Sequence, residues 1–216
     1  MSTEEEKRLA AETAAERIEP DSRVGLGTGT TVAYVLDAIA RRGVPARYVA
    51  TSPQTAEVAR SLGITVEEFD ALDELDLAID GADQIAPDGW LVKGRGGAQL
   101  REKIVAASAR TFVVIADSSK PVTALHAPIP LELRPFGLRA TLRELGAVTL
   151  RDVGPSPDGG VLCDYHGDVS SARALAEHFE SIPGISAHGL FAPELVSEII
   201  VATAKTVTIS TPGGQQ

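Results

Sequence analysis

Short runs of Val, Ile and Leu alternate with helical segments along the first 120 residues, and this alternation constrains the fold more than any other feature of the sequence. The apolar runs cover residues 23–26, 47–50, 75–79, 90–92 and 111–116, and the helical segments between them cover 31–42, 54–62 and 98–110. Strands that alternate with helices form βα units around a parallel sheet that is buried on both faces. We therefore expect an α/β fold, with a Rossmann-like, mostly parallel sheet flanked by helices.

The pattern changes after residue 127. Strand and helix signals follow at residues 130–133, 138–145, 147–151, 161–165, 170–179 and 185–190. This β-α-β-β-α-β order is typical of a split-βαβ, ferredoxin-like unit. The last apolar runs, 199–202 and 207–209, return to the first sheet, and the tail 211–216 is expected to fray. We predict a catalytic α/β domain of residues 1–127 plus 198–216 and an inserted α+β domain of residues 128–197.

Charge and composition exclude several classes of protein. The net charge of −10 and the pI near 4.9 disfavour binding to nucleic acid or to an anionic membrane surface. No stretch of roughly 18 apolar residues occurs, and the first twenty residues read as a charged, Ala-rich helix. We expect a soluble, cytoplasmic protein without a metal site, because the four histidines show no HExxH spacing. The single cysteine, Cys163, is expected to be a small buried residue of a strand.

Unusual residues follow four of the predicted strands at their carboxyl ends. The four segments are Gly27-Thr28-Gly29-Thr30-Thr31, Asp80-Gly81-Ala82-Asp83, Lys93-Gly94-Arg95-Gly96-Gly97 and Asp117-Ser118-Ser119-Lys120. Ligands of an open parallel sheet bind outside the carboxyl ends of its strands. We therefore expect one edge of the first sheet to carry all four segments.

The first of these segments leads directly into a helix. Free backbone N–H groups, threonine hydroxyls and the positive end of the helix dipole then converge, and together they form an anion-binding cradle. A dinucleotide-binding site is excluded, because the third glycine of its motif and the acidic residue near position 48 are missing. The structural alternative is a tight strand-to-helix turn in which Thr30 or Thr31 is the N-cap.

The second and third segments offer two carboxylates and an amine. Asp80 and Asp83 could be ordinary turn-forming or helix-capping residues, and Lys93 could be a surface lysine. Two carboxylates beside an amine and an anion cradle suit proton transfer on sugar hydroxyls better. Close pairing of Asp80 with Asp83 would separate their pKa values and provide one acid and one base.

Glu102 lies on an apolar stripe of the predicted helix 98–110. At 100° per residue, Ala98, Val105, Ala106 and Ala109 all project within about 60° of its direction. A glutamate in the first turn is also favoured by the helix dipole, by roughly 0.3–1 kcal/mol. That effect operates equally well on a solvated face, so a sequestered base explains the position better.

Taken together, these stretches resemble ribose-5-phosphate isomerase A. The matching residues are 25–31, 80–84, 93–103 and 116–120, with 166–167, 182–184 and 189–191 in the second half. The similarity covers essentially the whole chain, and four motifs in this order are highly specific. The sequence departs from the family pattern at Gln84, where Glu is usual, at Arg95, within a glycine run, and at Leu100, where Thr is frequent.

The resemblance implies interconversion of ribose 5-phosphate and ribulose 5-phosphate through a cis-enediolate, in the non-oxidative branch of the pentose phosphate pathway. It implies neither a metal nor an organic cofactor. Glu102 would be the carbon base, Asp80 or Asp83 would help to open the furanose ring, and Lys93 would stabilise charge on oxygen. The implied substrate contacts are Thr28, Gly29, Thr30, Thr31, Asp80, Gly81, Ala82, Asp83, Lys93, Gly94, Arg95, Gly96 and Lys120. The small domain would serve as a lid or subunit contact in a homodimer or homotetramer.

Two rival classes remain open at the level of sequence. A sugar-phosphate sensor domain of a repressor could share the cradle, but the first twenty residues are too short and too acidic for a DNA-binding helix-turn-helix. An acyl or CoA transferase on a related fold would use Glu102 as a nucleophile, and the chain is short for that chemistry.

Overall fold

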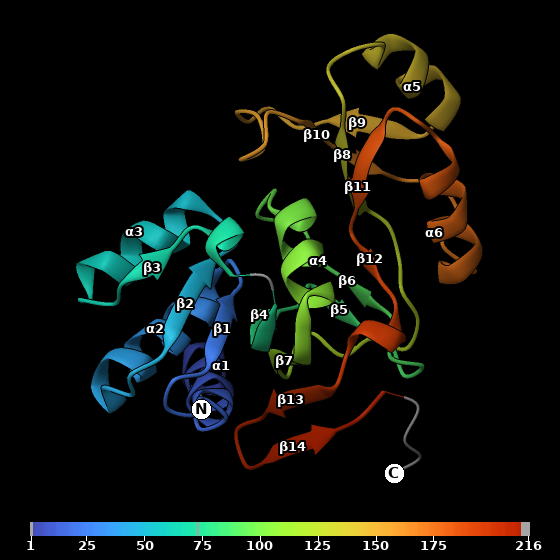
Figure 1. The fold of residues 1–216 in the computed structure, drawn as a ribbon. Helices are drawn as coiled ribbons and strands as arrows, with labels where there is room; N and C mark the ends of the chain where they lie inside the picture. The colour runs from blue at the N-terminus through green and yellow to red at the C-terminus, as the bar shows by residue number, and fades with distance from the viewer. Residues whose placement is uncertain (1, 73, 213–216) are drawn as a thin grey trace.

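A seven-stranded sheet forms the centre of the larger unit in the computed structural model, which describes residues 2–72 and 74–212 (Figure 1). The strand order is β14-β13-β7-β4-β1-β2-β3, and only β14 runs antiparallel to its neighbour. The strands are β1 (Arg23–Leu26), β2 (Arg47–Ala50), β3 (Val66–Glu67), β4 (Leu75–Gly81), β7 (Ala109–Asp117), β13 (Glu198–Ala202) and β14 (Val207–Ser210). The predicted parallel sheet is confirmed, and so is the return of the last two strands to it.

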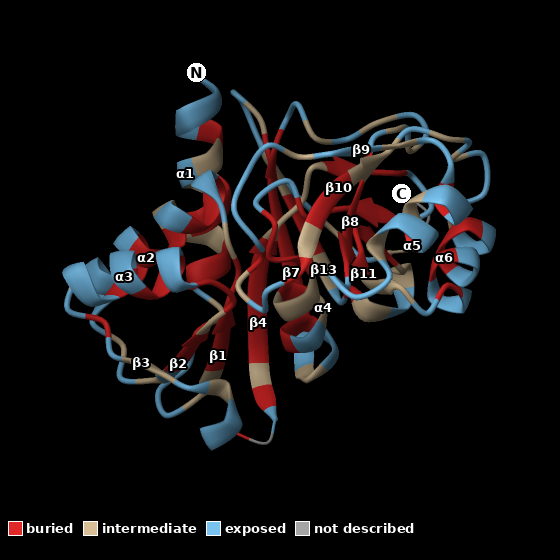
Figure 2. Cartoon of the chain, turned by 90° about the horizontal axis from the view of Figure 1, so that it is seen from above, coloured by how far each residue is buried: buried red, intermediate tan, exposed pale blue. Residues whose placement is uncertain are grey.

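Helices cover both faces of this sheet (Figure 2). They are α1 (Thr3–Ala15), α2 (Thr30–Arg42), α3 (Pro53–Ser61) and α4 (Gln99–Ala107), with the short 3-10 helices η1 (Phe69–Ala71) and η2 (Pro193–Leu195). Successive residues of β7 alternate between two hydrophobic clusters, since side chains of a strand point to opposite faces. Val113 and Ile115 pack with α1 and α2, whereas Phe112 and Val114 pack with α4. None of the described helices is long and apolar enough to cross a bilayer.

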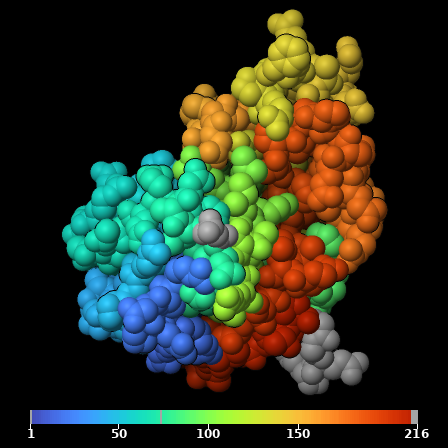
Figure 3. Space-filling view, viewed as in Figure 1, coloured from blue at the N-terminus to red at the C-terminus, as the bar shows by residue number. Residues whose placement is uncertain are grey.

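The smaller unit is a four-stranded antiparallel sheet with two helices. Its elements are β8 (Ile129–Leu133), α5 (Leu138–Leu145), β9 (Val148–Leu150), β10 (Val161–Tyr165), α6 (Ala172–Ser181) and β11 (Ile185–His188). The strand order β11-β8-β10-β9 is that of a split-βαβ unit, as the sequence predicted. Figure 3 shows this unit in yellow and orange at one end of the molecule. Cys163 is fully buried on β10, as expected.

A small third sheet connects the two units, and the sequence did not reveal it. It has the order β12-β6-β5 and consists of β5 (Gln84–Ile85), β6 (Leu91–Val92) and β12 (Leu190–Phe191). The prediction that residues 90–92 belong to the main sheet is therefore wrong. These residues form a short hairpin with β5 and pair with β12 instead. Likewise, the single strand expected at 185–190 is divided into β11 and β12, which pair in different sheets.

Helix α4 is shorter than the predicted segment 98–110. It ends at Ala107, with Ser108 as its C-cap, and Ala109 already belongs to β7. The Ile104 carbonyl accepts from both the N–H of Ser108 at 3.0 Å and its hydroxyl at 2.8 Å, so the C-cap residue closes this end of the helix. Of the tail for which fraying was expected, residues 213–216 lie outside the described part of the chain.

The packing of the smaller unit predicts a large difference between two leucines on its strands. Leu131 on β8 is completely buried, whereas Leu150 on β9 is 53% exposed. We expect Leu131→Ala to lower the free energy of unfolding by about 2–5 kcal/mol, because it leaves a cavity in the core. Leu150→Ala should change it by less than about 0.5 kcal/mol. Urea unfolding measures both values, and equal losses would contradict the burial assigned to the two strands.

Candidate active site

Lys93, Asp80 and Glu102 form a buried ionic cluster at the carboxyl edge of the main sheet. The Lys93 Nζ lies 2.8 Å from the Asp80 Oδ2 and 3.3 Å from the Glu102 Oε2, and it also donates to the Gly81 carbonyl. All three charged side chains are at most 4% exposed. Asp80 comes from the end of β4, Glu102 from the first turn of α4, and Lys93 from the loop after β6.

Burial and the shared lysine determine the charge states within this cluster. Burial, followed by repulsion from Asp80, raises the pKa of Glu102 to about 7. Burial likewise raises the pKa of Asp80, although Lys93 opposes the shift. Burial alone would lower the pKa of Lys93, but the two carboxylates outweigh it and the pKa is raised. At neutral pH Lys93 therefore stays protonated. Beside it, the carboxyl group of Glu102 can both accept and return a proton, as a general base requires.

The loop after β1 fixes the carboxylate of Asp80. The Asp80 Oδ1 accepts from the backbone N–H of Thr28 at 3.2 Å and from that of Gly81 at 2.7 Å. A Cβ atom at Gly27 would lie 1.9 Å from the Asp80 carboxyl group, so only glycine permits this approach. The turn of residues 80–83 and the loop of residues 27–31 thus depend on each other for their positions.

The first turn of α2 forms the opposite end of the site. Gly29 is the N-cap and makes no side-chain capping bond, so the alternative in which Thr30 or Thr31 caps the helix is wrong. The hydroxyl of Thr28 lies 2.8 Å from that of Thr51, which leaves the Thr30 and Thr31 side chains as the hydroxyls at this helix end. The unpaired N–H groups of such a turn attract an anion.

A cavity of about 410 Å³ joins these parts. Its lining residues are Lys7, Thr28, Gly29, Thr30, Thr31, Gly81, Ala82, Asp83, Lys93, Gly94, Arg95, Gly96, Glu102 and Lys120. Every substrate contact that the sequence suggested is among them except Asp80, which lies behind Lys93. The sequence predicted that the main sheet alone carries the four segments at this edge, and this prediction is wrong for one of them. The Lys93 loop reaches the edge from the small third sheet.

Lys7 is a residue of this cavity that the sequence reasoning missed. It lies on α1, which the sequence indicated only as a charged, Ala-rich helix. The Glu6 carboxylate accepts from the Ser118 N–H at 3.0 Å and from its hydroxyl at 2.6 Å, which fastens α1 to the loop after β7. Lys7 and Lys120 consequently line the same cavity. The sequence held one signal for this residue: Lys7 is a single lysine that follows three acidic residues in the first helix.

Asp83 is not the partner of Asp80, contrary to the expected carboxylate pair. Its Oδ2 accepts from the backbone N–H of Arg95 at 3.1 Å, while Asp80 shares Lys93 with Glu102. The Arg95 side chain is 82% exposed, with its Nε 3.9 Å from the Asp83 Oδ1, so it extends to solvent at the edge of the cavity. Gln84 lies outside the cavity and exchanges hydrogen bonds with the backbone of His126, at 2.8 and 2.9 Å.

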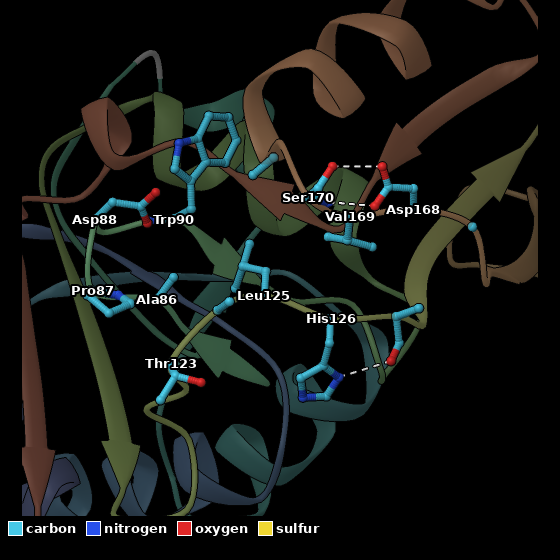
Figure 4. Close-up of a pocket in the computed structure, with 14 residues that line it drawn as sticks. Ala86, Pro87, Asp88, Trp90, Thr123, Leu125, His126, Asp168, Val169 and Ser170 are labelled. Carbon is cyan, nitrogen blue, oxygen red and sulfur yellow. Dashed lines mark hydrogen bonds between the residues drawn. The ribbon is translucent and has the colours of Figure 1, made fainter.

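A larger hollow of about 550 Å³ lies beside Trp90, His126 and Asp168 (Figure 4). Ser170 donates to Asp168 through both its N–H and its hydroxyl, and His126 contacts the adjacent Ala127 carbonyl at 3.0 Å. No lysine or arginine is among the described residues that line it, so these residues offer no countercharge for a phosphate. No group of three or more His, Cys, Asp or Glu suited to a metal ion occurs in residues 2–72 and 74–212. The 410 Å³ cavity is the candidate site, because the buried lysine and Glu102 line it together with the helix N-terminus.

Comparison with known proteins gives one consistent result. A family model described as ribose 5-phosphate isomerase A (phosphoriboisomerase A) matches residues 47–206. Curated proteins named ribose-5-phosphate isomerase A are 44% identical over 202 residues in Roseiflexus castenholzii (86% of each chain) and 42% identical over 221 residues in Haloarcula marismortui (95% of each).

Solved structures agree over the full length of the chain. The ribose 5-phosphate isomerase A of Neisseria gonorrhoeae superposes with a TM-score of 0.93 at 30% identity, covering 99% of both chains. A D-ribose-5-phosphate isomerase in complex with phospho-erythronic acid superposes with a TM-score of 0.90 at 33% identity, covering 98% of this chain and 100% of that one.

The buried cluster predicts an unusual titration for Glu102. Its pKa of about 7 lies above the ordinary value of 4.5, so between these pH values the folded state binds more protons than the unfolded chain. The contribution of Glu102 to stability is therefore present below pH 4.5 and is lost as the pH rises through 7. Carbon-13 NMR of glutamate-labelled protein should show one carboxyl resonance titrating near pH 7 that is missing from Glu102→Gln. A Glu102 resonance titrating near 4.5 would contradict the buried ionic cluster.

Proposed function

Because the chain belongs to the ribose-5-phosphate isomerase A family, it is an aldose-ketose isomerase that interconverts ribose 5-phosphate and ribulose 5-phosphate, and we propose that Glu102 is its carbon base. The reaction belongs to the non-oxidative branch of the pentose phosphate pathway. One observation carries the assignment of roles: a buried carboxyl group with a pKa of about 7 touches the lysine at the inner end of the cavity. The other end of the cavity provides cations and a helix N-terminus.

The phosphate binds at the outer end of the cavity in this proposal. The free N–H groups of the first turn of α2 and the hydroxyls of Thr30 and Thr31 donate hydrogen bonds to its oxygens, while Lys7 and Lys120 balance its charge. The net charge of −10 makes such a local device necessary, since the protein as a whole repels an anion.

Asp83 opens the furanose ring, and Asp80 positions Lys93. Asp83 lines the cavity, where it can take the proton of the anomeric hydroxyl, whereas Asp80 is enclosed by Lys93 and two backbone N–H groups. This division assigns the ring-opening role to Asp83. It is supported by the position of each carboxylate relative to the cavity.

Glu102 then moves a proton between two carbons. It removes the proton on C2 as the electrons of that bond form a C1–C2 double bond and the C1 carbonyl oxygen becomes negatively charged. Lys93 stabilises the resulting cis-enediolate. A proton passes from O2 to O1, the carbonyl forms at C2, and Glu102 returns its proton to C1. We propose that no metal or organic cofactor takes part.

The small unit, residues 128–197, acts as a lid or a subunit contact in a cytoplasmic homodimer or homotetramer. Apolar side chains on its surface support a subunit contact, since Phe136 is 95% exposed, Val153 62% and Leu150 53%.

Glu102→Gln tests the role of the base. Glutamine keeps the volume of the side chain but cannot accept a proton, so kcat should fall by roughly 10²–10⁴-fold. Exchange of the C2 hydrogen with deuterated water should fall in parallel, while the affinity for a phosphorylated aldonic acid changes far less. Turnover, NMR-detected exchange and inhibitor binding measure the three quantities.

Glu132→Gln is the matched control, because Glu132 is an equally buried glutamate on β8, away from the cavity. Its turnover should remain close to that of the unmodified enzyme. If Glu102→Gln keeps normal exchange while Asp83→Asn abolishes it, the base is Asp83 and our assignment fails. If the unmodified protein binds the aldonic acid but converts no ribose 5-phosphate, the chain is a sensor.

Lys7→Gln tests the proposed phosphate site. Loss of a hydrogen bond to a charged group should raise the KM for ribose 5-phosphate by roughly 10-fold and leave kcat nearly unchanged. Arg8→Gln is the control, since Arg8 stacks on Tyr34 at 5.6 Å and does not line the cavity. Steady-state kinetics at constant ionic strength separates the two. An equal rise in KM for both variants would indicate only a general effect of charge.

A further inference from the structure

Arg151 of the small unit holds the glycine loop of the active site. Its Nη1 donates to the Gly94 carbonyl at 3.0 Å and to the Arg95 carbonyl at 3.1 Å. The side chain is only 14% exposed, although it follows the edge strand β9. One arginine nitrogen thus binds two consecutive carbonyls of the loop that carries Lys93.

Arg151 is itself fixed by a two-point bond to Asp164. The Nε donates to the Asp164 Oδ2 at 3.0 Å and the Nη2 to the Oδ1 at 2.7 Å. In addition, the backbone N–H of Arg151 donates to the Leu162 carbonyl on β10 at 3.0 Å. The planar guanidinium can bind a carboxylate along one edge and carbonyls along another, which a lysine cannot do.

The geometry of the peptide bond gives this contact a consequence inside the cavity. In a trans peptide the N–H points opposite to the carbonyl of the same unit. Two carbonyls that converge on Arg151 therefore direct the N–H groups of Arg95 and Gly96 away from it. The Arg95 N–H donates to Asp83 at 3.1 Å, whereas no group in the described part of the chain accepts from the Gly96 N–H. Gly94 has a φ of +102°, a conformation that turns the loop and that glycine adopts without strain.

We propose that Arg151 is a positioning residue, which presents the Arg95 N–H to Asp83 and the Gly96 N–H to an oxygen of the sugar in the transition state. The positive charge of Arg151 polarises both peptide units and strengthens both donors. Residues of the small unit thereby determine the geometry of the sugar end of the cavity. This inference rests on the proposed function, because it assumes that the developing oxyanion lies at that end.

A merely structural role for Arg151 would affect stability or all ligands alike. Donors that act on the oxyanion instead affect kcat and the binding of an acid that imitates the enediolate, and leave phosphate binding unchanged. Phospho-erythronic acid is such a probe, because its carboxylate oxygens stand for the two oxygens of the enediolate. Inorganic phosphate is the matching probe for the other end of the cavity.

The test compares Arg151→Gln with Arg101→Gln. The control breaks a different arginine–aspartate pair, Arg101 to Asp158 at 2.8 Å, which links α4 to the small unit and does not include the glycine loop. For Arg151→Gln we expect kcat to fall by roughly 10- to 100-fold and the Kd of phospho-erythronic acid to rise by about 10-fold, since loss of a complete oxyanion donor costs roughly 10²–10³-fold. The Kd of inorganic phosphate should change by less than about 2-fold, and Arg101→Gln should change none of the three.

Asp164→Asn provides a second test, because it keeps the contacts of Arg151 with the two carbonyls but weakens the ion pair that holds the guanidinium. It should shift the same quantities in the same direction by a smaller factor. If Arg151→Gln folds normally and keeps kcat, or loses affinity for phosphate as much as for the acid, the inference is wrong. The proposed function is tested separately by Glu102→Gln with Arg151 intact, so the failure of either idea can be recognised.

Discussion

The structure depends on the burial of the Lys93 ammonium between two carboxylates. An isolated charge in an apolar interior is strongly unfavourable, and so is a carboxylate that has lost its partner. Lys93, Asp80 and Glu102 are each almost fully enclosed, so the ammonium of Lys93 is stable there only while neighbouring carboxylates balance its charge. The loop after β6, the end of β4 and the first turn of α4 must consequently adopt one common arrangement.

The same arrangement produces the chemistry. Burial of the carboxyl group, followed by repulsion from Asp80, raises the pKa of Glu102 to about 7 and keeps its proton available. A glutamate on the solvated side of α4 would be fully ionised and a weaker base. The apolar stripe around Glu102 therefore matters for catalysis as much as for packing, because it excludes the water that would otherwise restore an ordinary pKa.

The small α+β unit is part of this site through backbone contacts. The Lys93 N–H donates to the Gly189 carbonyl at 2.8 Å, and Arg151 binds the carbonyls of Gly94 and Arg95. Both contacts come from the second half of the chain and act on main-chain atoms. A family of sequences could vary the side chain at position 95, which is exposed here, without losing the shape of the loop.

The sequence by itself determined the parallel sheet, the split-βαβ unit and, with the exception of Lys7, the residues that line the cavity. These follow from local signals: the alternation of apolar runs with helical segments, the glycines and charges just after each strand, and the helical spacing around Glu102. Tertiary structure alone decided that Lys93 reaches the edge from a third sheet and that Asp80 is coupled to Glu102 and not to Asp83. It also decided that Lys7 and Arg151 join the site, through contacts such as Glu6 to Ser118 and Arg151 to Gly94 that span 112 and 57 positions. The physical reason is that local pattern specifies which face or strand end a side chain occupies, whereas partners distant in sequence are selected only when the whole chain packs.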